Sequence, residues 1–218
     1  MENKSSTKGG NSAPIPEPTL RRLPVYHQYL KNLGPTKYST ISCTQIAQDL
    51  HLTPIQVRKD LACTGIVGKP KTGYDVNSLL GSIEDFLGWN NPNEALLFGA
   101  GHLGMALLMY EGFRNYGLDI VAAVDPDKEK HGSAANDKKI LPLEKAAGLI
   151  RRMHLKLAVL AVPEAVAQKT ADLCVASGIK AIWNFAPVKI SVPPDVIVQH
   201  ENLASSLAVL SKKIGMTA

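Results

Sequence analysis

The sequence predicts an α/β protein of two domains, in which an N-terminal winged helix-turn-helix domain is followed by a Rossmann-type doubly wound parallel sheet and a C-terminal helix. Three observations predict this. Residues 18–88 hold capped helical segments and a basic loop with several glycines, residues 89–200 alternate apolar strands with helices, and residues 201–218 carry one apolar stripe. Residues 1–17 are rich in Lys, Ser, Gly and Asn and are expected to form a disordered tail.

Helices are expected at the start of the first domain over residues 20–33, 43–50 and 54–63. Apolar residues recur there at spacings of three and four, and Ser42 and Thr53 are of the residue types that cap helix N-termini. The side chains predicted to face the core are Leu23, Tyr26, Leu30 and Leu33, then Ile46, Ala47 and Leu50, then Ile55, Val57 and Leu61. A helix, a short helix, a turn and a further helix are typical of a helix-turn-helix.

The third helix leaves polar side chains available to a partner. Gln56, Arg58 and Lys59 lie off its apolar face, where they can meet solvent or a DNA groove. The basic loop 65–74 that follows suits the wing of a winged helix. A further helix and the polar segment 88–93 then separate this domain from the next.

The run 94–108 reads as a buried strand, a glycine turn and the start of a helix, which is how a dinucleotide pyrophosphate is held. Gly99 allows the tight turn, Gly101 lets the main chain approach the phosphates, and Gly104 permits close packing of helix on strand. A second strand ends in Asp125, 21 residues after Gly104, where a carboxylate accepts hydrogen bonds from ribose hydroxyls and repels a 2′-phosphate. This spacing favours NAD(H) over NADP(H); the alternative is a glycine-turned βα unit with an empty crevice.

The remaining elements alternate as a parallel sheet covered on both faces requires. After a polar loop up to Lys139, helices are predicted over 143–153 and 164–177, and strands over 157–162, 179–184 and 196–199. A last helix carries an apolar stripe formed by Leu203, Leu207, Leu210 and Ile214. The domain offers no internal groove for this stripe, so the helix is expected to dock on a partner subunit.

The charge distribution indicates an anionic partner for the first domain. Residues 20–80 hold eight basic and three acidic side chains, so the whole net charge of +5 lies there. Nucleic acid fits such an excess, and an ordinary solvated basic surface is the alternative. Cys43, Cys63 and Cys174 form neither a disulfide framework nor a zinc-ligand spacing, so a cytoplasmic protein without a metal site is expected. Neither a signal peptide nor a membrane-spanning apolar run is found.

Five blocks in a fixed order give the chain a resemblance to a known family. They are Gln56-Val-Arg-Lys-Asp-Leu61, Gly73-Tyr74-Asp-Val76, the turn Gly99–Gly104, Ala161-Val-Pro163 and Asn184-Phe-Ala-Pro-Val188. From about Pro16 to Ile214 the chain resembles the Rex redox-sensing transcriptional repressors. The resemblance implies a homodimer whose winged helices read an inverted-repeat operator in double-stranded DNA, whose Rossmann domains sense the NADH/NAD+ ratio, and whose C-terminal helices swap between subunits. NADH binding would release the operator, and the protein would not be an enzyme.

The same resemblance assigns candidate binding residues. For NADH/NAD+, an effector that is not turned over, these are Gly99, Ala100, Gly101, His102, Leu103, Gly104, Tyr110, Asp125, Val162, Pro163, Asn184, Phe185, Ala186 and Pro187. For DNA they are Gln56, Arg58, Lys59, Lys69 and Lys71. An Arg on the recognition helix can contact a guanine edge, a Lys there can neutralise phosphate, and the wing lysines would contact the DNA backbone or minor groove. The structural alternatives are core packing of Tyr110, an ion pair of Arg58 with Asp60, and solubilising charge on the wing.

Two departures from the family set further expectations. The segment 62–65 is Ala-Cys-Thr-Gly where the family has Ser-Tyr-Phe-Gly, so packing under the wing is expected to differ. Gln28 and Asn202 stand where the family has an arginine–aspartate pair between subunits, and an amide hydrogen bond would replace that pair without burying charge. The alternative functions are an NAD-dependent oxidoreductase, for which no Tyr-x-x-x-Lys pair is found, and a CoA-binding module with an accessory helical domain.

Overall fold

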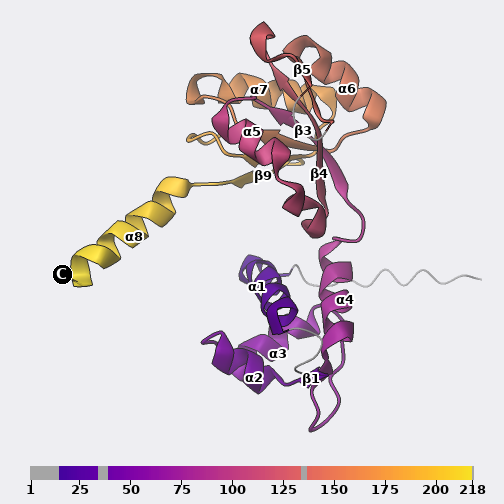
Figure 1. Ribbon diagram of the computed structural model, residues 1–218, viewed down its shortest axis with the longest axis vertical. Helices are drawn as coiled ribbons and strands as arrows, with labels where there is room; N and C mark the ends of the chain where they lie inside the picture. Colours follow the sequence, from indigo (N-terminus) through magenta and orange to yellow (C-terminus); the bar gives the residue numbers. More distant parts are fainter. Residues whose placement is uncertain (1–14, 34–38, 134–136, 218) are drawn as a thin grey trace, which may run out of the picture. The chain divides into compact units, whose positions relative to one another are not determined.

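The computed structural model describes residues 15–33, 39–133 and 137–217 (Figure 1). Contacts divide the chain into two compact units, Met1–Asn90 and Asn91–Ala218. Residues 1–14 of the expected tail lie outside the described residues. Glu17, which was expected in the tail, is the first residue of a helix, because an acidic side chain in the first turn complements the helix dipole.

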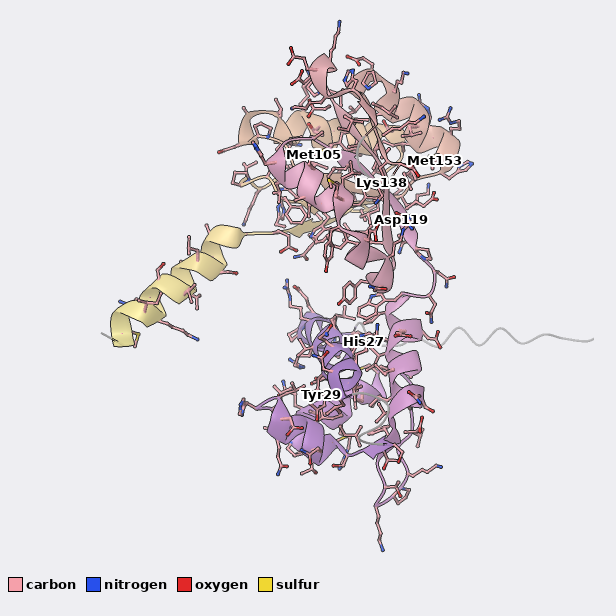
Figure 2. All side chains as sticks on the ribbon, viewed as in Figure 1. His27, Tyr29, Met105, Asp119, Lys138 and Met153 are labelled. Atoms are coloured by element: carbon pink, nitrogen blue, oxygen red, sulfur yellow. The ribbon has the colours of Figure 1, made fainter. Side chains whose placement is uncertain are left out.

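The described part of the first unit is mainly helical. Its helices are α1 (Glu17–Leu33), α2 (Cys43–Asp49), α3 (Pro54–Ala62) and α4 (Val76–Leu87). Ser42 and Thr53 begin α2 and α3 as predicted, because each side-chain oxygen accepts a hydrogen bond from the backbone N–H three residues further on, and Asp75 does the same for α4. His27 of α1 lies with Nε2 2.7 Å from Oε1 of Glu84 in α4 (Figure 2).

The wing is a small antiparallel structure. Its strands are β1 (Thr40–Ile41) and β2 (Tyr74–Asp75), which pair antiparallel. Before β2 the chain folds back on itself, with two backbone hydrogen bonds between Lys69 and Gly73 of 2.7 and 2.9 Å. The basic loop therefore has the hairpin geometry that a wing requires.

The helices of the first unit enclose an apolar core. Its fully buried members include Leu23, Tyr26, Leu30, Ile46, Ala47, Val57, Leu61, Leu79 and Ile83, and the predicted Leu33 and Leu50 are partly buried against them. One prediction is wrong here, since Ile55 is 67% exposed. α3 turns Val57 and Leu61 inward, and Asp60 occupies the next inward position. Ile55 is therefore left on the opposite face of the helix.

The second unit is built on a seven-stranded sheet. Its strands are β3 (Asn93–Phe98), β4 (Leu118–Asp125), β5 (Gly132–Ser133), β6 (Lys139–Pro142), β7 (Leu157–Leu160), β8 (Ala181–Asn184) and β9 (Ile197–His200). They lie in the order β5-β6-β4-β3-β7-β8-β9, with every neighbouring pair parallel except β5 with β6. Without β5 this is the doubly wound Rossmann order, whose switch point lies between β3 and β7.

The strands β5 and β6 were not predicted. The sequence indicates only a polar loop up to Lys139, because the apolar residues of β6 form a very short run and β5 has two residues. β5 lies at the edge of the sheet, where short strands are common, and β6 lies between β5 and β4. The sheet is thus mixed at this one edge.

Helices cover both faces of the sheet, as predicted (Figure 1). They are α5 (His102–Met109), the 3-10 turns η1 (Glu111–Tyr116), η2 (Lys128–Lys130) and η3 (Leu143–Lys145), and the helices α6 (Ala146–Met153) and α7 (Glu164–Ser177). The core that α6 and α7 share with the sheet contains Leu96 and Phe98, whereas the core under α5 and η1 contains Leu97 and Val159. Successive residues of β3 therefore serve opposite faces.

The last helix, α8 (Leu203–Thr217), follows β9. Of the predicted stripe, Leu207, Leu210 and Ile214 are between 56% and 64% exposed, and the side chain of Leu203 lies outside the described part. Val209 and Met216, on the opposite face, are 57% and 77% exposed. The helix thus turns an apolar stripe to solvent, which a helix of a stable monomer rarely does. Of the helices that are described, none is both long and apolar enough to cross a membrane.

Candidate nucleotide crevice and DNA-binding surface

The glycine turn follows β3 at the switch point of the sheet. Gly99 has a φ of +93°, and a Cβ there would lie 2.5 Å from the carbonyl oxygen of Ala161, so the turn requires glycine. A Cβ on Gly104 would lie 1.8 Å from the carbonyl oxygen of Gly99, which is the close helix packing that the sequence predicts. A Cβ on Gly101 would meet no described atom within 4 Å. The turn is therefore closed toward the protein and open beside Gly101.

Loops from two neighbouring strands begin at the same edge of the sheet as the turn. Residues 161–163 lead from β7 into α7, and residues 185–187 follow β8. The strand ends are joined by backbone hydrogen bonds of 2.9 Å, from Ala161 N–H to Phe98 and from Phe185 N–H to Leu160. Because the carboxyl ends of parallel strands share one edge of the sheet, segments far apart in sequence come together here.

Asp125 ends β4 beside the turn and is 5% exposed. Its carboxylate accepts hydrogen bonds from the backbone N–H groups of Ala100 at 2.7 Å and Asp127 at 2.9 Å, and Lys130 Nζ lies 3.3 Å away. Burial acts most strongly and opposes the charge, but the two N–H groups and then Lys130 together outweigh it and hold the pKa of Asp125 below its usual value. Asp125 therefore braces the glycine turn, a role that the sequence spacing does not reveal.

A row of aromatic rings runs through this domain. Tyr110, at the end of α5, is 55% exposed, so the alternative that it packs in the core is wrong. Its ring meets Phe113 edge-on at 4.8 Å between centroids, and contacts of 5.5 and 4.7 Å continue the row through Trp183 to Phe185. The row offers a surface on which a planar ring can stack.

Asn184 is fully buried, and its amide is used within the chain. Its Nδ2 donates to the carbonyl of Val188 at 2.9 Å and lies 3.0 Å from Nδ1 of His200. The neighbouring Trp183 donates its Nε1 hydrogen to Oε1 of Glu201 at 2.8 Å. These contacts join the loop after β8 to the segment that leads into α8. Sequence reasoning missed Trp183 and Glu201, because no local pattern signals a pair that joins separate elements.

The predicted cofactor residues differ in exposure. The exposed ones are Gly101, His102, Leu103, Tyr110, Pro163 and Pro187, the partly buried ones Gly99, Val162 and Phe185, and the buried ones Ala100, Gly104, Asp125, Asn184 and Ala186. All of them except Tyr110 lie at the carboxyl ends of β3, β4, β7 and β8 or in the turns and helix starts that follow. The topology thus brings together residues that are widely separated in sequence.

α3 presents a charged face to solvent. Arg58 and Lys59 are exposed, and Gln56 is partly buried. Within the described residues neither cation pairs with a carboxylate, so the alternative of an ion pair between Arg58 and Asp60 is wrong. Both side chains are therefore available to an anionic partner.

Asp60 instead fixes α3 on α1. Arg22 donates to both of its carboxylate oxygens at 2.7 and 2.8 Å, and the hydroxyls of Tyr26 and Thr19 donate at 2.7 and 2.8 Å. Burial opposes the charge most strongly, yet these donors keep the pKa of Asp60 below its usual value. Arg22 is one of the eight basic residues counted in the charge excess, but its charge is paired with Asp60 and stabilises the packing of α1 on α3.

The wing lysines lie beside the cationic face of α3. Lys69 and Lys71 are exposed. A cavity of about 400 Å³ lies between the wing and α3, and Arg58, Lys69, Lys71 and Tyr74 are among the residues that line it. Burial, and then its contact with Cys43, raise the pKa of Tyr74, so the phenol remains neutral beside these cations. The structure therefore gathers Arg58 and both wing lysines around one groove, where positive charge attracts phosphate.

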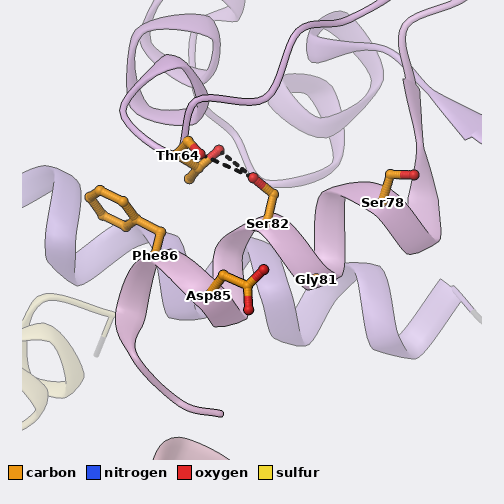
Figure 3. A pocket seen from close by; sticks show the side chains of 6 residues that line it. All are labelled: Thr64, Ser78, Gly81, Ser82, Asp85 and Phe86. Carbon is orange, nitrogen blue, oxygen red and sulfur yellow. Dashed lines mark hydrogen bonds between the residues drawn. The ribbon is translucent and has the colours of Figure 1, made fainter. Parts of the chain in front are cut away.

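A separate hollow of about 530 Å³ lies along α4 (Figure 3). It is lined by Thr64, Ser78, Gly81, Ser82, Asp85 and Phe86. Ser82 Oγ donates to the carbonyl of Thr64 at 3.1 Å. Thr64 stands where the resembling family has phenylalanine, so the hollow is consistent with the expected difference in packing under the wing. None of the predicted DNA-binding residues lines it.

Together the two units define a class of protein, the DNA-binding regulators whose second domain is a Rossmann-type nucleotide-binding fold. Comparison with family models supports both halves. Residues 14–62 match a model described as "Putative DNA-binding protein N-terminus", and residues 90–188 match one described as "CoA binding domain".

Individual relatives specify the family. The redox-sensing transcriptional repressor Rex of Treponema denticola is 48% identical over 88% of this chain and 92% of its own length. The crystal structure of RSP with β-NAD+ and operator DNA is 32% identical with a TM-score of 0.88, covering 94% of this chain and 95% of that one. RSP with β-NADH is 31% identical with a TM-score of 0.85, covering 94% and 97%. The chain belongs to the Rex family of redox-sensing transcriptional repressors, which confirms the predicted family and favours a repressor over an enzyme.

Proposed function

We propose that this protein represses transcription by binding operator DNA through its first domain, and that NADH bound in the Rossmann crevice releases the DNA. One observation carries the proposal: a single chain combines cations on α3 that pair with no carboxylate among the described residues with a glycine turn that is open beside Gly101. The likeness to RSP solved with β-NAD+ and operator DNA, with a TM-score of 0.88, supports both halves.

In the crevice, the pyrophosphate contacts the turn 99–104. The main chain can approach most closely at Gly101, where no described atom lies within 4 Å of a Cβ position. The N-terminus of α5 supplies N–H groups and the positive end of the helix dipole, and its cap has no side-chain hydrogen bond that competes with a ligand. Asp125 accepts from the adenosine ribose with the lone pairs that its internal donors leave.

The nicotinamide lies toward the aromatic row that begins at Tyr110 and ends at Phe185. Val162, Pro163, Ala186 and Pro187 form the walls of the crevice, and Asn184 positions the loop after β8 instead of contacting the ligand. The reduced ring is uncharged and costs less to desolvate beside aromatic carbon than the cationic oxidised ring. NADH therefore binds more tightly than NAD+, the difference in affinity that a redox sensor requires.

On DNA, α3 enters the major groove. Arg58 and Gln56 contact base edges and Lys59 neutralises phosphate, while Lys69 and Lys71 hold the backbone or the adjacent minor groove. An inverted-repeat operator requires a two-fold symmetric reader, so the acting species is a homodimer in the cytoplasm.

The exposed stripe of α8 supplies the dimer contact, by a swap of this helix onto the partner subunit. Within the chain, Gln28 Nε2 donates to Asn32 at 3.1 Å, and Asn202 caps α8 by accepting from the Ser205 N–H at 3.1 Å. Asn202 thus keeps its Nδ2 hydrogens for a bond to the partner subunit. An amide contact there replaces the charge pair of the resembling family without burying an ion.

The repressor activity is tested on DNA. The full-length protein is used to select operators from random double-stranded DNA, and binding of the selected sequence is measured by fluorescence anisotropy with and without saturating NADH. We expect an inverted repeat, a steep loss of affinity with salt, and weaker binding when NADH is present. Selection of no sequence would contradict the DNA half, and equal affinity with and without NADH would contradict the coupling.

The ligand is tested by fluorescence. The chain has two tryptophans, and Trp89→Phe leaves Trp183 as the only tryptophan donor for energy transfer to NADH. We expect saturable transfer with NADH, weaker competition by NAD+ and none by coenzyme A. Tight binding of coenzyme A with no response to NADH would instead favour the module that the second family model names.

A further inference from the structure

The recognition helix carries one large apolar side chain at the N-terminal end of its exposed face. Ile55, Arg58, Lys59 and Ala62 recur at spacings of three, four and seven and are exposed, opposite the inward-facing Val57 and Leu61. Ile55 is 67% exposed and is the second residue of α3, after Pro54. An exposed isoleucine alone needs no explanation, but this one lies among the cations that face DNA.

The residues around Ile55 indicate what kind of molecule would bind there. Ile55 borders a hollow of about 510 Å³, to which Gln56, Lys59 and Thr53 also contribute. Because the exposed Lys59 lies beside Ile55, this patch favours a partner that offers phosphates and an apolar group together. The major groove does so, because the thymine C5-methyl group is the apolar group that base pairs display there.

The position of Ile55 suits base contact. In helix-turn-helix proteins, the N-terminal residues of the recognition helix contact base edges, while the preceding helix crosses the backbone. Ile is branched at Cβ and has few rotamers, so fixing it against a base costs little entropy. We propose, on the basis of the proposed function, that Ile55 recognises a thymine in each operator half-site by contacting the C5-methyl group of that base.

The test removes that methyl group alone. In the operator selected with the full-length protein, each thymine is replaced in turn by deoxyuridine in both half-sites, and Kd is measured by anisotropy for the wild type, Ile55→Ala and Val67→Ala. Val67 is the control, because it is an apolar residue of the wing that is 88% exposed. The replacement keeps every hydrogen-bonding group of the base pair.

We expect one symmetric position at which deoxyuridine weakens the wild type by about fourfold per half-site, the effect of burying one methyl group. Ile55→Ala should bind more weakly overall and lose the discrimination at that position only, while Val67→Ala retains it. The inference is overturned if the wild type binds the operator with no methyl-sensitive position, or if Ile55→Ala keeps the full discrimination. Failure to select any DNA would overturn the proposed function as well.

Discussion

At the scale of the residue, two buried aspartates show how much a role depends on partners. The position of Asp125 at the end of a strand could be predicted from the sequence. Its hydrogen bond from the Ala100 N–H could not, because that contact depends on the register of β3 and β4. For Asp60, the sequence suggests only an ion pair with the nearby Arg58. The real partner of Asp60, Arg22, lies 38 residues away in sequence, beyond the reach of any local pattern.

Asp60→Asn is expected to destabilise the first unit by about 3 kcal/mol, because it leaves the Arg22 guanidinium without its counter-charge. The native pKa of Asp60 is depressed, so its contribution is present above the unfolded pKa of about 4 and is lost as pH falls through that value toward the native pKa. Urea unfolding from pH 7 down to pH 3 measures this. Parallel losses of stability in wild type and variant on acidification would contradict it.

The cations proposed to bind DNA should differ in whether they contact bases or only phosphates. Arg58→Ala is expected to lower operator affinity by about ten- to hundredfold and to relax base preference, whereas Lys71→Ala should weaken all sequences alike and reduce the salt slope by about one. NADH affinity should be unchanged in both, since neither residue belongs to the second unit. Anisotropy titrations at several salt concentrations, on the operator and on scrambled DNA, distinguish the two. Identical effects of both variants on the two DNAs would argue against base contact by Arg58.

At the scale of the element, most helices could be predicted because caps and apolar spacing are local. Ser42 and Thr53 begin α2 and α3 as predicted. The exposure of Ile55 could not be predicted, because its apolar character predicts burial. Only the buried position of Asp60 shows which face of α3 is exposed to solvent. β5 and β6 could not be predicted for a related reason, since each has only two to four residues and its pairing partner is distant or not signalled by a local pattern.

In the glycine turn, a single methyl group can be added at Gly104, where it would face the protein, or at Gly101, where it would face the proposed ligand. In Gly104→Ala the new Cβ would lie 1.8 Å from the Gly99 carbonyl oxygen, so we expect a loss of about 1 to 3 kcal/mol in the free energy of unfolding. In Gly101→Ala the Cβ meets no described atom within 4 Å, so stability should change by less than about 0.5 kcal/mol.

NADH affinity should nevertheless fall by about tenfold or more in Gly101→Ala, since the methyl group keeps the pyrophosphate from the main chain. Thermal unfolding and energy-transfer titration of both variants measure the two effects. Unchanged NADH affinity in Gly101→Ala would show that the phosphates bind elsewhere.

At the scale of the whole molecule, the proposed regulation requires that a ligand bound at the glycine turn alter the binding of DNA by the first unit. The crevice and α8 are joined by side chains of β8: Asn184 holds the loop 185–187 and contacts His200, and Trp183 donates to Glu201. We therefore expect a movement of this loop to displace residues 200–201, which precede α8. Such coupling is a free energy between two sites, and it acts equally in both directions.

Trp183→Phe tests this connection, because it keeps an aromatic ring in the row and removes the hydrogen bond to Glu201. We expect NADH to bind the free variant about as tightly as the wild type. The factor by which NADH weakens operator binding should fall by about three- to tenfold, which corresponds to the net free energy of one hydrogen bond. By reciprocity, the factor by which operator DNA weakens NADH binding should fall equally.

Calorimetric titrations of NADH with and without operator, and anisotropy titrations of operator with and without NADH, give both factors. Lys180→Gln is the matched control, because it breaks the exposed 2.7 Å ion pair with Asp195 between β8 and the segment before β9 without touching Glu201. The control should leave both factors unchanged. If Trp183→Phe also leaves them unchanged, the signal does not pass through β8 and must reach the DNA-binding domain by another route.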